Sequence, residues 1–235
     1  FSEADKQKYL ASYVTTYLRE EIQQEGVTRN LSGFTRFLEV ASFSQAQLLN
    51  ISAVARESAI NRKVAENYFS ILEDFLIAER VPVFTKKAKR RMTSHPKFYF
   101  FDTGIYRTIR PRGPLDTPED IDGAALETLI QQEIKAMNSY KNYGYGLYFW
   151  RTASGTEVDT VLYGERGIIA IEVKRSARAT KEELKGLTEF LKEYPQAHAY
   201  LVYGGTRERW ENNIRIISAE KFLKNISGIL KGDIR

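Results

Sequence analysis

The sequence contains no cysteine, and only two of its 235 residues are histidines. The absence of cysteine excludes disulfide bonds and thiolate metal sites, and His95 and His198 are too few to build a histidine-rich metal cage. We interpret His198, which lies in the stretch AHAY at residues 197–200, as a strand residue rather than a ligand. A metal site in this chain must therefore be built from oxygen ligands.

Long apolar runs are also absent. No run approaches the roughly 18 residues that a membrane-spanning helix needs, and no signal peptide opens the chain. We therefore expect an intracellular, cytoplasmic protein without a membrane partner. The chain begins at Phe1 without an initiator methionine, from which we expect a fragment of a longer protein.

The residues that are present indicate a folded protein with a mild positive charge. Hydrophobic residues make up 43% of the chain and charged residues 28%, and the net charge is +5. The length suits two domains of about 100 residues each. A charge of this size is compatible with a polyanionic partner but does not by itself demonstrate one. The basic residues are locally concentrated in one run without acidic residues, namely Lys86, Lys87, Lys89, Arg90 and Arg91.

Helical spacing of apolar residues dominates the first part of the chain. It predicts amphipathic helices over residues 3–25, where Tyr9 is one of the apolar positions, and over residues 31–41. A short helix capped by Ser52, a turn at residues 58–61 and a helix over residues 61–78 then predict a helix-turn-helix. The predicted buried residues of the last helix are Val64, Tyr68, Ile71, Leu72, Phe75 and Leu76.

Two apolar segments, residues 81–84 and 97–102, bracket the basic run and predict the wing of a winged helix. Such a unit binds DNA by placing its second helix in the major groove while the wing contacts phosphate. Winged helices also serve as protein-interaction modules, so both kinds of partner stay open. The residues expected to contact DNA are Arg62, Lys63 and Asn67 on the helix, and Lys86, Lys87, Lys89, Arg90 and Arg91 in the wing.

Glycine and proline cluster at residues 103–121, and the domain boundary is expected there. We expect a helical and winged-helix domain at residues 1–110, a linker at 111–122 and a second domain at 123–235. Together they predict an α+β protein whose second domain has an α/β core in the order αβββαβ. The elements predicted after the boundary are helices at residues 123–140, 180–194 and 219–225, and strands at 145–151, 156–163, 167–174, 198–203 and 214–217.

The strands predicted at residues 156–163 and 167–174 carry a pattern of charged residues. Because alternate strand residues face the same way, Glu172 and Lys174 share a face with Ile168 and Ala170, and pairing of the strands in the natural register brings Asp159 beside them. Two carboxylates can hold a divalent cation, and a nearby lysine can orient or deprotonate water or stabilise a phosphate transition state. The same pattern also occurs at the solvated end of an ordinary charged strand.

Two glutamates on the helix predicted at residues 123–140 are further candidates. Glu133 falls inside the apolar arc of that helix, and Glu127 lies just beyond its edge. A carboxylate on a core-facing stripe is costly unless it meets a cation or hydrogen-bond donors. Either glutamate is therefore a candidate to point toward the strands.

The order αβββαβ, with Glu127 on the first helix, Asp159 on the second strand and Glu172-x-Lys174 on the third, resembles the restriction-endonuclease-like PD-(D/E)XK nuclease superfamily. The resemblance implies that Asp159, Glu172 and Glu127 bind Mg²⁺ or Mn²⁺ and that Lys174 assists the attacking water, so all four residues are candidate catalytic residues. Val158 stands before Asp159 where the superfamily has proline, and that proline is commonly replaced.

Five blocks in order resemble the C-terminal region of a large family of prokaryotic AAA-type ATPases. That region is a domain of unknown function that follows a P-loop ATPase domain. The resemblance implies that the ATPase domain is a partner outside this chain, that ATP binds only there, and that Arg19 could act near nucleotide; the alternative for Arg19 is a solvated, ion-paired face. The blocks are residues 9–22, 49–81, 96–107, 123–134 and the pair 147–162 and 169–176.

Three functions are compatible with these patterns. The first is a metal-dependent endodeoxyribonuclease that is part of such an ATPase. The second is a catalytically silent module that binds DNA or protein for the ATPase. The third is a regulatory domain that positions ATPase subunits, which would make the protein a homo-oligomer.

Overall fold

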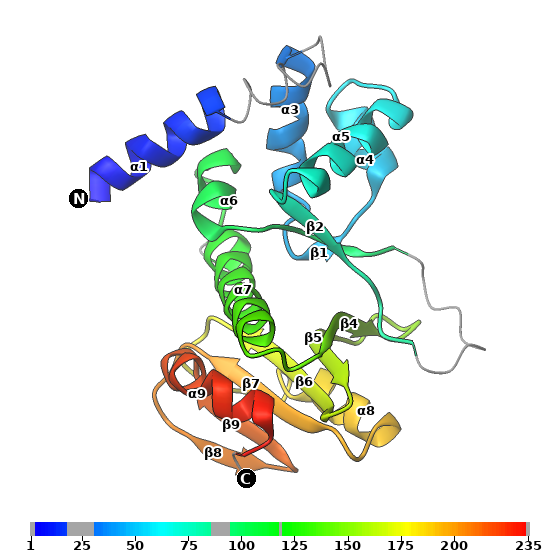
Figure 1. The fold of residues 1–235 in the computed structure, drawn as a ribbon, viewed down its shortest axis with the longest axis vertical. Coiled ribbons are helices and arrows are strands. Elements are labelled where there is room, and N and C mark those ends of the chain that lie inside the picture. Colours follow the sequence, from blue (N-terminus) through cyan, green and yellow to red (C-terminus); the bar gives the residue numbers. More distant parts are fainter. Residues whose placement is uncertain (1–2, 18–30, 86–94, 118, 234–235) are drawn as a thin grey trace. The chain divides into compact units, whose positions relative to one another are not determined.

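The computed structural model describes residues 3–17, 31–85, 95–117 and 119–233, and it divides into two compact units (Figure 1). The first unit comprises residues 1–80 and 97–117, and the second comprises residues 81–96 and 118–235. The described residues form helices and two sheets, so the mixed α+β class expected from the sequence is confirmed.

The first unit combines helices with a small sheet in which the strand order is β1-β3-β2 and β1 runs antiparallel to β3. Its elements are α1 (Glu3–Ser12), the π-helix η1 (Tyr13–Tyr17), α3 (Leu31–Ser42), β1 (Gln47–Leu48), α4 (Ile51–Glu57), α5 (Arg62–Asp74), β2 (Ala78–Val81), β3 (Lys97–Phe100) and α6 (Thr103–Ile109).

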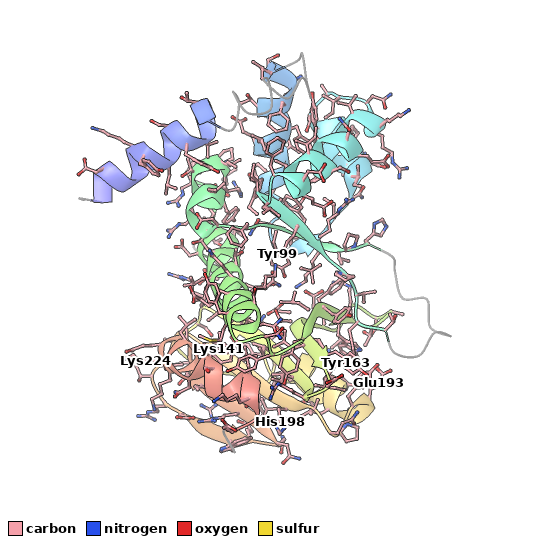
Figure 2. All side chains as sticks on the ribbon, in the orientation of Figure 1. Tyr99, Lys141, Tyr163, Glu193, His198 and Lys224 are labelled. Atoms are coloured by element: carbon pink, nitrogen blue, oxygen red, sulfur yellow. The ribbon has the colours of Figure 1, made fainter. Side chains whose placement is uncertain are left out.

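Aromatic side chains from α3, α5 and β3 form the core of the first unit. Phe37 of α3 packs edge-on against Tyr68 and Phe69 of α5, with ring centroids 5.2 and 4.8 Å apart. Phe69 in turn meets Phe98 of β3 at 5.2 Å. Tyr99, the next residue of β3, is also completely buried (Figure 2). Edge-on ring pairs add stabilisation beyond the area they bury, so α3, α5 and β3 are held as one cluster. The amphipathic helix predicted over residues 31–41 is confirmed: it corresponds to α3, in which Phe34, Phe37, Leu38 and Ala41 are all buried.

Several helix boundaries in this unit differ from the prediction. Asn50, and not Ser52, caps α4, because its side chain accepts a hydrogen bond from the Ala53 N–H at 3.0 Å. The helix predicted over residues 61–78 ends at Asp74, and Leu76 just beyond it has left-handed backbone with φ 56°. That left-handed residue turns the chain out of the helix.

The buried face of α5 also differs in part from the predicted one. Tyr68, Ile71 and Leu72 are buried as predicted, but Leu76 is 79% exposed and Val64 is 38% exposed. Two further residues of α5, Ala65 and Phe69, are buried instead.

The helix predicted over residues 3–25 is described only to Tyr17, as α1 followed by η1. Tyr9, which was predicted on its buried face, is 71% exposed. Arg19 lies outside the described residues. At the other end of the unit, α6 forms within the predicted breaker cluster, because Asp102 caps it by accepting a hydrogen bond from the Ile105 N–H at 2.8 Å.

The strand predicted at residues 81–84 does not pair as expected. The strand β2 ends at Val81, and Val83 forms an isolated bridge with Phe149 of the second unit's sheet. The Phe84 N–H donates to the Phe149 carbonyl oxygen at 2.6 Å, and the Phe84 ring is buried in the core of the second unit. The basic run at residues 86–91 lies outside the described residues, so the wing stays a prediction.

The second unit contains the succession α7-β4-β5-β6-α8-β7, which has the order αβββαβ. Its elements are the π-helix η2 (Glu119–Gly123), α7 (Ala124–Tyr140), β4 (Gly146–Arg151), β5 (Glu157–Gly164), β6 (Gly167–Lys174), α8 (Lys185–Glu193), β7 (His198–Tyr203), β8 (Arg209–Glu211), β9 (Ile214–Ser218) and α9 (Ala219–Lys231). Compared with the prediction, α8 begins later, α9 runs further and β8 is additional.

The sheet of the second unit has the strand order β4-β5-β6-β7-β9-β8 and carries one hydrophobic core on each face. Strands β4, β5 and β6 pair antiparallel, whereas β6, β7 and β9 pair in parallel. The predicted alternation in β6 is confirmed, because Ile168 and Ala170 face the core that includes α8, and Ile169, Ile171 and Val173 face the core that includes α7 and α9.

The structure bears on the predictions made for His198 and for membrane-spanning helices. His198 is the first residue of β7 and is exposed (Figure 2), so it stands in a strand as predicted. Among the helices of the described segments, none combines the length and the apolar character needed to cross a membrane.

Candidate active site

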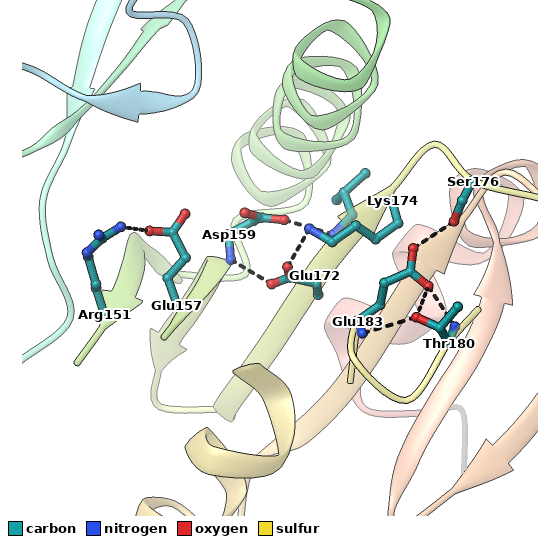
Figure 3. Close-up of polar contacts among 9 residues, drawn as sticks. Arg151, Glu157, Asp159, Glu172, Lys174, Ser176, Thr180 and Glu183 are labelled. Carbon is teal, nitrogen blue, oxygen red and sulfur yellow. Dashed lines mark hydrogen bonds and ion pairs between the residues drawn. The ribbon is translucent and has the colours of Figure 1, made fainter. Parts of the chain in front are cut away.

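The site lies where β5 and β6 stop pairing. Thr160 and Ile171 are the last paired residues, and Asp159 and Glu172 come next on the two strands. Their carboxylates take up backbone donors of the opposite strand: the Asp159 N–H donates to Glu172 Oε2 at 3.3 Å, and the Val173 N–H donates to Asp159 Oδ2 at 3.0 Å (Figure 3). Asp159 is only 4% exposed and Glu172 only 6%. The two buried carboxylates are therefore held side by side in fixed orientations.

Lys174 completes the cluster. Its Nζ lies 2.7 Å from Glu172 Oε1 (Figure 3). Burial lowers the pKa of Lys174, but the negative charges of Asp159, Glu172 and Glu127, together with the hydrogen bond to Glu172, outweigh that effect and raise the pKa above its ordinary value. At neutral pH Lys174 is therefore an ammonium group that donates hydrogen bonds.

The structure separates the two candidate glutamates of α7. Glu133 is exposed, and Glu127 is partly buried. The charge of Glu127 is one of those that raise the pKa of Lys174. Of the two, Glu127 is thus the one associated with the cluster.

A cavity of about 390 Å³ opens beside the cluster, between the β4–β5 turn and the start of α8. Glu172 and Lys174 line it together with residues of the turn and of α8, whereas Asp159 is not among the lining residues. Gly186 lets α8 approach the sheet closely here, because a methyl group at this position would overlap with the carbonyl oxygen of Glu157. Glu157 is itself paired with Arg151 across β4 and β5 at 2.5 Å (Figure 3).

The segment between β6 and α8 is fixed by a network around Glu183. Its carboxylate accepts hydrogen bonds from the Thr180 N–H at 2.7 Å and from the Ser176 hydroxyl at 2.8 Å, while the Glu183 N–H donates to the Thr180 hydroxyl at 3.4 Å (Figure 3). Such reciprocal bonds between a threonine and a glutamate three residues later are those of a capping box. They order the chain directly after Lys174.

The residues of the cluster fit a hard divalent cation. Mg²⁺ usually keeps several waters and is bound by one or two carboxylates together with substrate phosphate, and Asp159 and Glu172 supply two adjacent carboxylates. Their charges also exceed the single positive charge of Lys174. Within the described part of the chain, no group of three or more histidine, aspartate and glutamate side chains is placed to hold a metal ion. The remaining ligands would have to be water, phosphate or a rearranged Glu127.

The residues predicted to contact DNA lie in the first unit or outside the described residues. Arg62, Lys63 and Asn67 are all exposed on α5, and Arg62 pairs with Glu66 at 3.1 Å. The five basic residues of the predicted wing fall within residues 86–94, which are not among those described.

The sequence patterns did not predict the close packing of Gly186 or the cationic side chains that follow β6. The close packing of a helical glycine leaves no signal in a single sequence, because the partner carbonyl is 29 positions away along the chain. The cations Arg178 and Lys181 follow the Glu172-x-Lys174 motif closely and could have been noticed as a stretch without acidic residues.

Two parts of the chain match protein families for which no activity is assigned. Residues 1–116 match the family described as domain of unknown function DUF8612, and residues 122–222 match the domain of unknown function DUF4143. The chain is 26% identical over 208 residues to uncharacterized proteins of Mycobacterium bovis and Mycobacterium tuberculosis. These matches cover 87% of this chain and 45% of each relative, so the chain spans about half the length of the curated relatives it matches. No solved structure matches the chain.

Proposed function

We propose that the second unit is a metal-dependent phosphodiester hydrolase that cleaves DNA. The observation that carries this proposal is the cluster of Asp159, Glu172 and Lys174, in which two buried carboxylates and an ammonium group meet at the end of two paired strands. The order αβββαβ and the position of Glu127 on the first helix support a restriction-endonuclease-like arrangement.

The chemistry divides between the cation and the chain. Mg²⁺ or Mn²⁺, held by Asp159 and Glu172 with Glu127 nearby, would polarise the phosphate and lower the pKa of a bound water. The reciprocal backbone bonds keep the two carboxylates oriented. Lys174, as an ammonium group, donates hydrogen bonds that position the attacking water or stabilise the negative charge that develops on the phosphate oxygens.

We also propose that the first unit contacts DNA and that the whole chain works with an ATPase domain. Arg62 and Lys63 begin α5 and Asn67 lies further along it, all three are exposed, and the basic run at residues 86–91 adds positive charge. DUF4143 domains are commonly found with AAA-type ATPases, and the chain spans about half of its relatives. ATP would then bind only in that separate domain, and ATPase subunits would bring the chain into a homo-oligomer in the cytoplasm.

One observation favours a second candidate, a catalytically silent module that binds DNA or protein. Lys174 already neutralises part of the charge of Glu172 through a 2.7 Å contact, and Asp159 does not line the cavity. In a silent module the ammonium group of Lys174 would neutralise the carboxylates in place of a divalent cation.

A cleavage assay separates the two candidates. The protein is incubated with supercoiled, linear and branched DNA in Mg²⁺, Mn²⁺ or EDTA. We expect cleavage that depends on metal and disappears in Lys174→Ala, because the charge stabilisation near the phosphate is lost. Lys192→Ala is the matched control, since it removes the same charge from an exposed position on α8. Absence of cleavage with every metal would leave the silent module as the better account, and full activity of Lys174→Ala would show that the cleavage does not depend on Lys174.

A further inference from the structure

Two loops at the end of β6 and β7 are joined by backbone contacts. The Gly204 N–H donates to the carbonyl oxygens of Lys174 and Ser176, both at 3.0 Å. A side chain at Gly204 would overlap with the carbonyl oxygen of Arg175, and one at Gly205 would approach that of Ala177. Glycine at these two positions is therefore what lets loop 204–209 lie directly on loop 175–181.

Side-chain bonds fix both loops further. The Ser176 hydroxyl shares its one hydrogen between the Glu183 carboxylate and the Arg178 carbonyl oxygen, which lies 2.9 Å away, and the Tyr203 hydroxyl donates to the Arg207 carbonyl oxygen at 2.6 Å. The Arg209 guanidinium reaches across to the Ala179 carbonyl oxygen at 3.2 Å. Loops ordered in this way lose little conformational entropy when they bind a partner.

The two joined loops carry exposed cationic side chains that form no ion pair with other described residues. Arg178, Lys181 and Arg207 are exposed, and within the part of the chain that the structure describes none of them forms an ion pair. The other two cations of the loops are paired, Arg175 with Glu119 and Arg209 with Glu211.

Three exposed lysines of the neighbouring helices are ion-paired instead. Lys192 on α8 pairs with Glu189, and on α9 Lys224 pairs with Glu220 and Lys231 with Asp233. Their charges are thus neutralised locally, whereas those of Arg178, Lys181 and Arg207 are available to a partner.

We propose that loops 175–181 and 204–209 bind the phosphate backbone of a nucleic acid through Arg178, Lys181 and Arg207. A nucleic acid is favoured over an acidic protein because both loops adjoin Lys174, one by following it in the chain and the other through the bond from Gly204 to its carbonyl oxygen. A nucleic-acid backbone bound to these loops would therefore lie next to Asp159, Glu172 and Lys174, which are proposed to hydrolyse it. This inference rests on the proposed function and adds a substrate-binding surface within the second unit itself.

The test is binding of fluorescently labelled duplex DNA of mixed sequence, measured by anisotropy in EDTA over a series of salt concentrations. The variant Arg178→Ala/Lys181→Ala/Arg207→Ala is expected to bind about tenfold or more weakly. The slope of log K against log salt concentration is expected to fall by about 2 to 3, because each lost phosphate contact contributes about 0.9 to that slope.

The matched control is Lys192→Ala/Lys224→Ala/Lys231→Ala, which changes the net charge equally and is expected to keep the affinity within about threefold. Circular dichroism confirms that both variants are folded. Equal losses in the two triple variants, unchanged binding by the loop variant, or absence of DNA binding by the unaltered protein overturns the proposal; binding to polyglutamate in place of DNA would assign the loops to an acidic protein.

The outcomes also separate this surface from the proposed hydrolase. If the unaltered protein binds DNA and the loop variant binds it weakly, but no metal supports cleavage, then the surface stands and the hydrolase fails. If the loop variant binds and cleaves as the unaltered protein does, then the hydrolase stands and the surface fails.

Discussion

Asp159→Asn is expected to lower the rate of Mg²⁺-dependent DNA cleavage by about a thousandfold or more, equivalent to roughly 4 kcal/mol of transition-state stabilisation. Asparagine keeps an oxygen that can accept the hydrogen bond from the Val173 N–H, so the local structure survives. It removes the negative charge that a divalent cation needs. The rate is measured under single-turnover conditions with saturating protein.

Two glutamates of α7 provide controls for this result. Glu133 is exposed, so Glu133→Gln is expected to cleave at the unaltered rate. Glu127→Gln is expected to cleave more slowly, because the charge of Glu127 acts on Lys174. Cleavage by Asp159→Asn within about tenfold of the unaltered rate would remove Asp159 from the site.

Gly186→Ala is expected to lower the free energy of unfolding by about 2 to 3 kcal/mol, because its methyl group would overlap with the Glu157 carbonyl oxygen and force α8 away from β5. Alanine is otherwise favoured over glycine inside a helix by about 1 kcal/mol, so the clash must exceed that gain. Urea unfolding followed by circular dichroism measures the difference.

Gly123→Ala is the matched comparison. Gly123 caps α7 with helical backbone (φ −63°, ψ −54°), and a methyl group there meets nothing within 4 Å. We expect this variant to be unchanged or slightly more stable. Equal stability of the two alanine variants would mean that α8 does not depend on its close approach to Glu157.

The central cluster could be predicted because strands have a strict period of two. Once residues 167–174 are assigned to a strand, Glu172 and Lys174 must share a face, and the two-residue turn at Glu165 and Arg166 fixes the register that brings Asp159 beside them. These relations depend only on residues close together in the sequence.

The choice between Glu127 and Glu133 could not be predicted in the same way. The apolar arc of α7 placed Glu133 inside, but the buried face of that helix includes the polar residues Thr128 and Gln131, while the apolar Leu126 is only partly buried. The buried face is set by the elements packed against the helix, so an arc drawn from apolar residues alone was displaced from it.

Contacts between distant segments account for a further group of differences. Phe84 lies in the core of the second unit and donates a backbone hydrogen bond to Phe149. The two residues are 65 positions apart, so no local sequence pattern could predict this contact. The adjoining loops 175–181 and 204–209 are likewise joined by hydrogen bonds, at the ends of the neighbouring strands β6 and β7. The position of a residue that depends on such contacts can be determined only from the three-dimensional structure.

Binding of Mn²⁺, followed by the electron paramagnetic resonance signal of the free ion, tests most directly whether Asp159 and Glu172 form a divalent-cation site. We expect one bound ion per chain, affinity at least about tenfold lower in both Asp159→Asn and Glu172→Gln, and unchanged affinity in Glu133→Gln. Absence of binding by the unaltered protein, or binding that both variants retain, would contradict a metal-dependent site at the end of β5 and β6.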